Sequence, residues 1–89
     1  MQLEKLISVN NNFQLQWEEH QNCFVLLYPE GMVQLSQSAG EIMNLCDGKN
    51  TVQNIIVKLE EKFSTTGLEK DIIEFLDDAV ERNWLVTDE

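Results

Sequence analysis

Basic residues are scarce in this sequence. Six Lys and Arg stand against 16 Asp and Glu, which gives a formal net charge of −10 at pH 7. Binding to a phosphate backbone needs clustered Lys and Arg, so this balance argues against a nucleic-acid-binding protein. No apolar run approaches the ~20 residues of a membrane-spanning helix. The first residues, MQLEKLISVNNN, lack the basic region and apolar core of a secretion signal. We therefore expect a cytoplasmic protein with no membrane contact.

Residues that carry catalysis or bind metals are also few. Cys23 and Cys46 do not form a C-x-x-C pair, and each lies in an apolar pattern, which predicts buried and unreactive thiols. The single histidine, His20, lies in the polar segment EEHQN, and no local motif ties a Ser or Cys to it. The many carboxylates have no spacing that separates an acid–base pair from surface charge. The sequence therefore predicts no enzyme, no catalytic residue, no metal site and no cofactor.

Three strands are expected in the first half of the chain. Phe13–Trp17 alternates apolar and polar residues, which is typical of a half-buried strand. Cys23–Tyr28 is apolar throughout, as expected for a strand covered on both faces. A turn with Pro29 at its second position leads into Met32–Leu35. These strands predict an antiparallel meander in which the first and third strands are edges.

Two short helices are expected next. Ser38 followed by Glu41 fits a capping box, and the helix that it begins is expected to end at Gly48. Asn50 or Thr51 is expected to cap the second helix. Its apolar positions recur at helical spacing: Val52, Ile55, Ile56, Leu59 and Phe63.

A third helix is expected from about Leu68 to Arg82. Thr66 followed by Glu69 fits another capping box. Asn83 is a suitable end to this helix because asparagine tolerates positive φ. The apolar tail Trp84–Val86 is expected to return to the core.

The order of these elements predicts the fold class. Strands followed by helices indicate an α+β protein, here a three-stranded antiparallel meander followed by a three-helix bundle in a winged-helix-like arrangement. Residues 1–12 carry Leu3, Leu6 and Ile7 but end in three asparagines, which predicts a loosely attached N-terminal arm. Residues 13–89 are expected to form one domain, which we interpret as a peptide-recognition domain on the grounds that follow.

The third helix is apolar over a wide arc. At ~100° per residue, its apolar positions cover roughly 180°, against roughly 100° for the stripe of an ordinary surface helix. Three of these residues are expected to face the core: Phe75, Ala79 and Ile72. Three others form a shoulder beside them: Ile73, Leu76 and Val80. Either the arm, the tail or the sheet covers this shoulder, or a partner does.

The third strand, Met32–Leu35, has neither charge nor proline, the devices that usually block a sheet edge. An open edge beside an apolar helix is a site where an extended peptide can add a strand. On this hypothesis, Val33→Pro should remove a free backbone donor and weaken binding. An open edge can also pair with a second copy, so a homodimer is possible.

A winged-helix module for protein or nucleic-acid binding is the alternative. A nucleic-acid binder of this architecture should have a basic recognition helix. The expected third helix carries six acidic residues against Lys70 and Arg82, so phosphate would repel it.

Four segments carry a resemblance to a known family: LLYPEGMVQL, the Ser38-Ala39 helix start, LCDG at 45–48 and the closing EFLDDAVERNWL. In this order and spacing, from Phe13 to Leu85, the sequence resembles the PqqD family of peptide chaperones in pyrroloquinoline quinone (PQQ) biosynthesis. One departure is Asn83, where the family's R-G-W ending has glycine. Asparagine is the next best residue for that conformation, so the fold expectation stands.

The resemblance implies a function. Family members bind the ribosomally made precursor peptide PqqA and present it to the radical SAM enzyme PqqE, which cross-links a Glu and a Tyr of the peptide. The chain itself would then catalyse nothing and would be a recognition element of a peptide-modifying pathway (a RiPP recognition element). In related domains the leader peptide adds to the third strand and packs against the third helix. Carried onto this sequence, the peptide-binding residues are Met32, Val33, Gln34, Leu35, Ser36, Ile72, Ile73, Leu76 and Val80.

Overall fold

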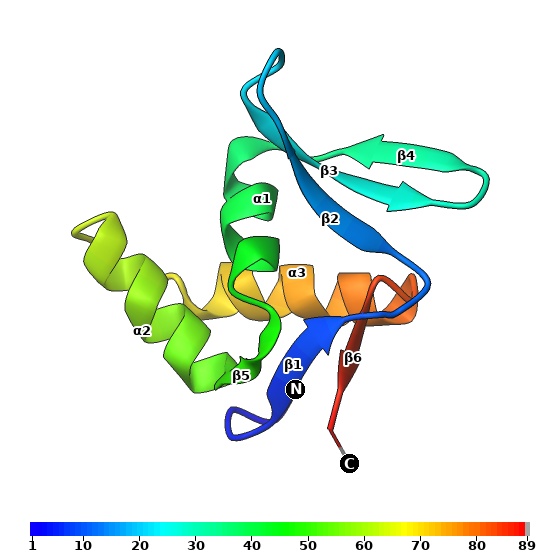
Figure 1. The fold of residues 1–89 in the computed structure, drawn as a ribbon. Coiled ribbons are helices and arrows are strands. Elements are labelled where there is room, and N and C mark those ends of the chain that lie inside the picture. Colours follow the sequence, from blue (N-terminus) through cyan, green and yellow to red (C-terminus); the bar gives the residue numbers. More distant parts are fainter. Residues whose placement is uncertain (89) are drawn as a thin grey trace.

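The computed structural model describes residues 1–88, and Glu89, the last residue of the expected domain, lies outside them. The described chain contains two antiparallel three-stranded sheets and three helices (Figure 1). The first sheet has the order β2 (Gln14–Glu18), β3 (Cys23–Tyr28), β4 (Gly31–Gln34). The second has the order β5 (Asp47–Thr51), β1 (Leu6–Val9), β6 (Leu85–Thr87). The helices are α1 (Gln37–Asn44), α2 (Val52–Lys62) and α3 (Glu69–Glu81). The α+β class, the meander and the three helices are confirmed, whereas the second sheet was not predicted.

The N-terminal segment is part of the fold. β1 is the central strand of the second sheet and pairs with both β5 and β6. Ile7 is 1% exposed and belongs to the core. The expectation of a loosely attached arm is therefore wrong for this strand. Its partners lie far along the chain, so no local pattern of apolar residues reveals the pairing.

The meander has a regular register. Leu15 lies opposite Leu26, and Leu26 lies opposite Val33, so these three side chains share one face of the sheet. Leu26 belongs to the core cluster, and Leu15 and Val33 pack against that cluster, which identifies this face as the inner one. The hairpin between β3 and β4 turns through Pro29 and Glu30.

The start of α1 differs from the capping box expected at Ser38. The Oγ of Ser36 accepts a hydrogen bond from the backbone N–H of Ala39 at 3.2 Å, so Ser36 is the N-cap. Glu41, the expected partner in that box, instead binds the Nζ of Lys62 through its Oε1 at 2.6 Å. The helix therefore begins almost directly where β4 ends.

The segment between α1 and α2 is strand β5, although the sequence predicted only a helix end at Asp47-Gly48. The N–H of Lys49 donates to the Oδ1 of Asp47 at 2.9 Å, and this hydrogen bond lowers the pKa of the Asp47 carboxyl. Thr51 caps α2 in a capping box with Asn54, which confirms one of the two expected caps.

α3 begins without a side-chain cap of its own, so the expected box of Thr66 and Glu69 is wrong. A carboxylate from α2 takes that place, because the Oε2 of Glu60 accepts from the N–H of Leu68 at 3.0 Å. At the other end, Asn83 adopts φ 66, as predicted. The tail then returns to the core through Leu85, 1% exposed, as predicted, whereas its pairing with β1 as strand β6 was not predicted (Figure 1).

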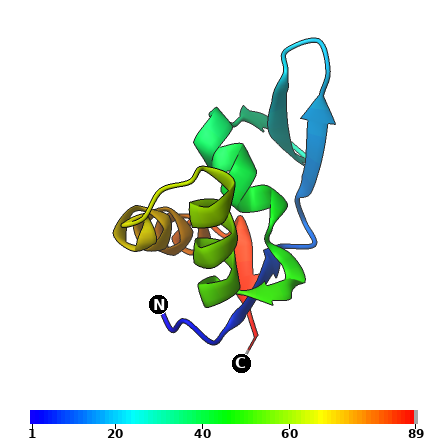
Figure 2. The same cartoon turned by 90° about the vertical axis from the view of Figure 1, so that its left-hand side faces the viewer.

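The core lies where the helices meet the inner faces of the sheets. The meander stands over α1 at one end of the molecule, and α2 and α3 pack side by side below it (Figure 2). The largest completely buried side chains come from most elements: Ile7, Leu26, Met43, Ile55, Leu76 and Leu85. Over residues 1–88, no helix combines the length and the apolar character that crossing a membrane requires.

Candidate functional site

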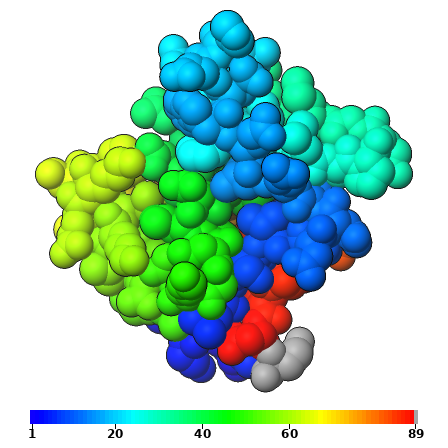
Figure 3. Space-filling model, in the orientation of Figure 1, coloured from blue at the N-terminus to red at the C-terminus, as the bar shows by residue number. Residues whose placement is uncertain are grey.

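β4 is an edge strand, as expected. It pairs with β3 on one side, and no other strand of residues 1–88 pairs with its second side. The four residues Gly31–Gln34 include no charged residue and no proline. The β3–β4 hairpin projects from the body of the molecule, which leaves this edge accessible (Figure 3, cyan to green). The edge therefore lacks the usual protection against pairing with another chain.

The register of the hairpin determines which backbone groups are free. The N–H of Leu35 donates to the carbonyl of Phe24 at 3.0 Å. Antiparallel pairs alternate between bonded and non-bonded residues, so Val33, opposite Leu26, also bonds inward. The free N–H and C=O groups of the edge are therefore those of Met32 and Gln34. The expectation that Val33 offers a free donor is wrong, because the sequence does not give the phase of the ladder.

The side chains of β4 alternate accordingly. Val33 is half-buried on the inner face, whereas Met32 is 52% exposed on the outer face together with Gln34. Leu35, 5% exposed, belongs to the core, and Ser36 is occupied as the cap of α1. Of the five residues expected here, Met32 and Gln34 offer free backbone groups. Val33 offers a half-buried apolar side chain on the inner face.

α3 lies on the β4 side of the meander. In Figure 2, β2 and α3 lie on opposite sides of the molecule, and the strand order places β4 away from β2. The hairpin tip, Tyr28–Glu30, shares a surface hollow with Arg82 and Asn83 at the end of α3. At the other end of β4, Ser36 shares a pocket with Phe75. The hairpin tip and the residue that follows Leu35 therefore each share a hollow with the second half of α3.

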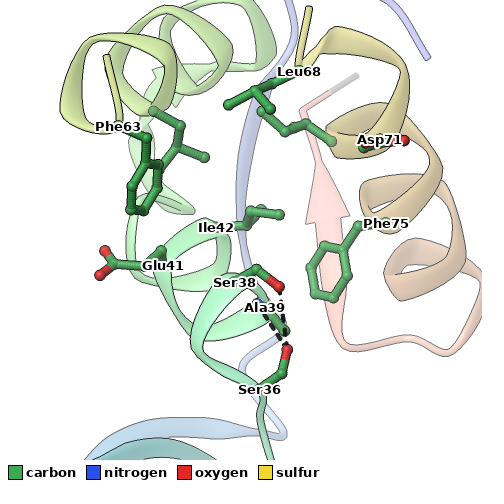
Figure 4. A pocket seen from close by; sticks show the side chains of 11 residues that line it. Ser36, Ser38, Ala39, Glu41, Ile42, Phe63, Leu68, Asp71 and Phe75 are labelled. Atoms are coloured by element: carbon green, nitrogen blue, oxygen red, sulfur yellow. Dashed lines mark hydrogen bonds between the residues drawn. The ribbon is translucent and has the colours of Figure 1, made fainter. Parts of the chain in front are cut away.

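That pocket is the most apolar hollow at this end of β4. It has a volume of about 430 Å³ and lies between all three helices (Figure 4). Ala39 and Ile42 of α1 and Phe75 of α3 line it, together with Phe63 at the end of α2. The ring of Phe75 and the side chain of Ile42 face one another across it (Figure 4).

Two carboxylates, those of Glu41 and Asp71, lie at the rim of this pocket and point away from its centre (Figure 4). Glu41 is paired with Lys62, whereas no cation of residues 1–88 forms an ion pair with Asp71. The rim is therefore negatively charged around an apolar interior.

The comparison with known families matches this architecture. The family model for Coenzyme PQQ synthesis protein D (PqqD) matches residues 23–85, which is most of the chain. The chain belongs to the PqqD family. The resemblance read from the sequence is confirmed, and membership agrees with the expectation of a recognition protein rather than an enzyme.

Several curated proteins named "PqqA binding protein" are similar to this chain over most of their length. The protein from Methylococcus capsulatus is 39% identical and covers 96% of this chain and 91% of its own. The protein from Azotobacter vinelandii is 44% identical, covering 93% and 91%. The protein from Acinetobacter baylyi is 47% identical, covering 85% and 78%.

Solved structures show the same fold. The PqqD part of Methylobacterium extorquens PqqCD, described as a functional and stand-alone RiPP recognition element, aligns with a TM-score of 0.73 at 28% identity. That alignment covers 90% of this chain and 87% of the other. The heterocyclase TruD aligns with a TM-score of 0.72 at 22% identity over 94% of this chain but 12% of its own, which is a likeness of fold.

The expected helix residues do not share one environment in this PqqD-family chain. Ile72 and Leu76 are 3% and 0% exposed and belong to the core, although Ile72 also reaches the pocket wall. Ile73 and Val80 are half-buried on the side of α3 that carries Asp77. The N-terminal ammonium group lies 3.9 Å from the Oδ1 of Asp77. The first residues of the chain therefore approach this shoulder, which agrees with the alternative in which the N-terminal arm covers it.

The sequence reasoning missed Phe75 as a site residue, because it assigned Phe75 to the core. Phe75 is half-buried and lines the pocket on the opposite side of α3 from Ile73. The wide apolar arc did contain this signal, since Phe75 stands at its other end. No pattern within the helix indicates which end of the arc lies nearer to β4.

The thiols and carboxylates of residues 1–88 form no cluster of metal ligands. Cys46 is buried, and this burial, reinforced by neighbouring Asp47, raises the pKa of its thiol to about 12. Among residues 1–88, no three His, Cys, Asp or Glu side chains gather as metal ligands would.

Proposed function

We propose that this protein binds the precursor peptide PqqA as an added strand along β4 and presents it to the radical SAM enzyme PqqE in PQQ biosynthesis. Membership of the PqqD family and the relatives named "PqqA binding protein" support the choice of peptide. One structural observation supports the mode of binding: the outward backbone groups of Met32 and Gln34 lie on an unguarded edge beside α3.

The binding step follows from the register. An extended peptide pairs its N–H and C=O groups with those of Met32 and Gln34, which gives affinity that depends little on sequence. Alternate peptide side chains then point toward the space between β4 and α3, where Val33 and Phe75 offer apolar contact and the ion pair of Asp78 and Arg82 lies on the same side of the helix. These contacts supply the preference for one peptide.

The presenting step follows from the length of the edge. β4 has four residues, so strand pairing holds a short segment of the peptide. The rest of the peptide extends beyond the protein and is free to enter the active site of PqqE. In this arrangement the protein raises the local concentration of substrate at the enzyme and takes no part in the cross-linking chemistry.

A titration of ¹⁵N-labelled protein with synthetic PqqA tests the binding mode. We expect the amide signals of Met32 and Gln34 to shift most among those of β4, because their N–H groups change partner from water to peptide. Unchanged signals for both residues at saturating peptide would overturn strand addition.

A matched pair of variants at one position sharpens the test. Gln34→Pro removes an outward donor without removing a hydrogen bond to β3, whereas Gln34→Ala changes only the side chain. We expect the proline variant to bind PqqA about tenfold more weakly, roughly the loss of one hydrogen bond, and the alanine variant to bind like the parent. Urea unfolding of both variants controls for folding, and equal binding by the two would contradict the proposal.

A further inference from the structure

We infer that the pocket between the three helices is a second anchoring site, which receives one large apolar side chain of the bound peptide, with a Lys or Arg next to it in the peptide. This inference rests on the proposed function and extends it beyond the strand-pairing segment. It is carried by the position, the lining and the rim charge of the pocket.

The position of the pocket makes it an extension of the β4 edge. Ser36 follows the last residues of the edge, caps α1, and is itself part of the pocket wall. A peptide that pairs with Gln34 and continues past the end of β4 therefore reaches the mouth of the pocket within one or two residues, since each extended residue spans ~3.3 Å. Continuity with the edge identifies the peptide as the occupant.

The lining of the pocket selects an apolar side chain. Its interior is formed by Ile42, Phe75 and Phe63, and the volume of about 430 Å³ is ample for an aromatic residue. Phe63 is 45% exposed although it is a large apolar residue at the end of a helix. Covering this side chain and the ring of Phe75 with an apolar guest removes apolar surface from water, which is the main favourable contribution to such binding.

The rim selects a basic neighbour. Lys62 already neutralises Glu41, but Asp71 has no ion-pair partner among residues 1–88. A Lys or Arg that flanks the anchored side chain can reach this carboxylate from outside the pocket. Because the whole chain has a net charge of −10, the same cation is also favoured at longer range.

The test of the pocket uses full-length protein and synthetic PqqA, with affinity measured by calorimetry. Ala39→Trp places a large side chain in the pocket without touching β4, and we expect about tenfold weaker binding or more. Phe63→Ala removes part of the wall, with Val57→Ala, 40% exposed on the same helix and outside this pocket, as its matched control. We expect Phe63→Ala to weaken binding several-fold and Val57→Ala to leave it unchanged.

The test of the rim compares two charge reversals on α3. Asp71→Lys alters the rim, whereas Glu74→Lys makes the same change of net charge on an exposed residue that does not line the pocket. We expect Asp71→Lys to weaken binding about fivefold more than Glu74→Lys at low salt, and the difference to fade as salt screens it. Equal effects of the two charge reversals would overturn the proposal that a basic residue of the peptide lies beside Asp71.

These outcomes separate the pocket from the proposed function. If PqqA shifts the amides of Met32 and Gln34 but binds Ala39→Trp and Phe63→Ala as it binds the parent, the pocket is not an anchor, while strand addition stands. If PqqA binds no form of the protein, both the proposed function and this inference fail. An alanine scan of the peptide completes the test, because alanine at the anchored position should abolish the difference between Ala39→Trp and the parent.

Discussion

At the scale of single residues, Gly40 marks the closest approach of α1 to the meander. A Cβ atom at this position would lie 2.9 Å from the Cδ2 of Phe24 and 3.3 Å from its Cβ. The glycine is fully covered and lies in the middle of a helix, where its backbone conformation gives it no advantage. Close packing of helix on sheet therefore explains why this position has no side chain.

Gly40→Ala is accordingly expected to destabilise the protein. Alanine is favoured over glycine in a helix by about 1 kcal/mol, but forcing a methyl group against Phe24 costs ~1–3 kcal/mol. We expect a net loss of about 1 kcal/mol in the free energy of unfolding, measured in urea. Gln37→Ala, exposed in the same helix, should be neutral or stabilising. A Gly40→Ala protein that is more stable than the parent would show that α1 can move away from the sheet.

The two thiols should differ sharply in reactivity. The thiolate is the reactive form, and burial raises the pKa of Cys46 to about 12, so very little thiolate exists at pH 8. The Sγ of Cys46 also donates to the carbonyl of Ile42 at 3.3 Å. Cys23 is partly exposed and is the first residue of β3. Both thiols were expected to be buried and inert, and that expectation holds for Cys46 alone.

A colorimetric thiol assay at pH 8 measures this difference. In the Cys23→Ser variant, we expect Cys46 to react only as fast as the protein opens, and rapidly once urea unfolds it. In the Cys46→Ser variant, Cys23 should react without denaturant. Fast labelling of Cys46 in the folded protein would mean that β5 and the end of α1 open readily.

At the scale of elements, the start of α3 depends on α2. The carboxylate of Glu60 accepts the hydrogen bond of Leu68 N–H, which serves as the missing cap of α3. We expect Glu60→Ala to lower the free energy of unfolding by about 1 kcal/mol, the usual cost of losing a cap. Glu60→Gln keeps an acceptor oxygen and should recover part of this loss.

Thr66→Ala is the matched control, because the sequence assigned the cap to Thr66 and the structure does not. Its urea midpoint should equal that of the parent. If Thr66→Ala were as destabilising as Glu60→Ala, the capping box predicted from the sequence would be formed after all.

The contrast between these two caps shows what local sequence can predict. The meander, the three helices and the left-handed Asn83 depend on residues close together in the chain, and each was predicted. The cap from Glu60 and the sheet around β1 depend on pairings between distant segments, and both were missed. Even within one segment, Ser36 and Ser38 are both good caps, and only the end of β4 decides between them.

The candidate site divides in the same way. An edge without charge or proline can be read directly from Met32–Leu35, and the structure leaves that edge open. The side of α3 that faces it cannot be read, because the apolar arc has Phe75 at one end and Ile73 at the other. The N-terminal segment approaches one of these ends, at Asp77, and thereby leaves the other for the pocket.

At the scale of the whole molecule, the N-terminal and C-terminal segments pair with each other in the second sheet. β1 and β6 come from opposite termini and pair directly, and the N–H of Leu6 also donates to the Oδ1 of Asp88 at 2.8 Å. The meander takes no part in this second sheet. The candidate binding edge, β4, thus belongs to the first sheet, while the contacts between the two terminal segments lie at the other end of the molecule (Figure 1).

The net charge of −10 opposes the pairing of two copies of the chain through the open β4 edge when no peptide is bound. Two copies that approach through β4 repel each other, and this repulsion extends over a Debye length of ~30 Å at 0.01 M salt but only ~3 Å at 1 M. We therefore expect a monomer in 0.01 M NaCl and self-association through β4 in 1 M NaCl, measured by sedimentation. Gln34→Pro should remain monomeric in both, while Gln34→Ala should behave as the parent, because only the proline removes an outward donor. A dimer at low salt would contradict the repulsion argument, and one that persists in the proline variant would place the contact on a surface other than β4.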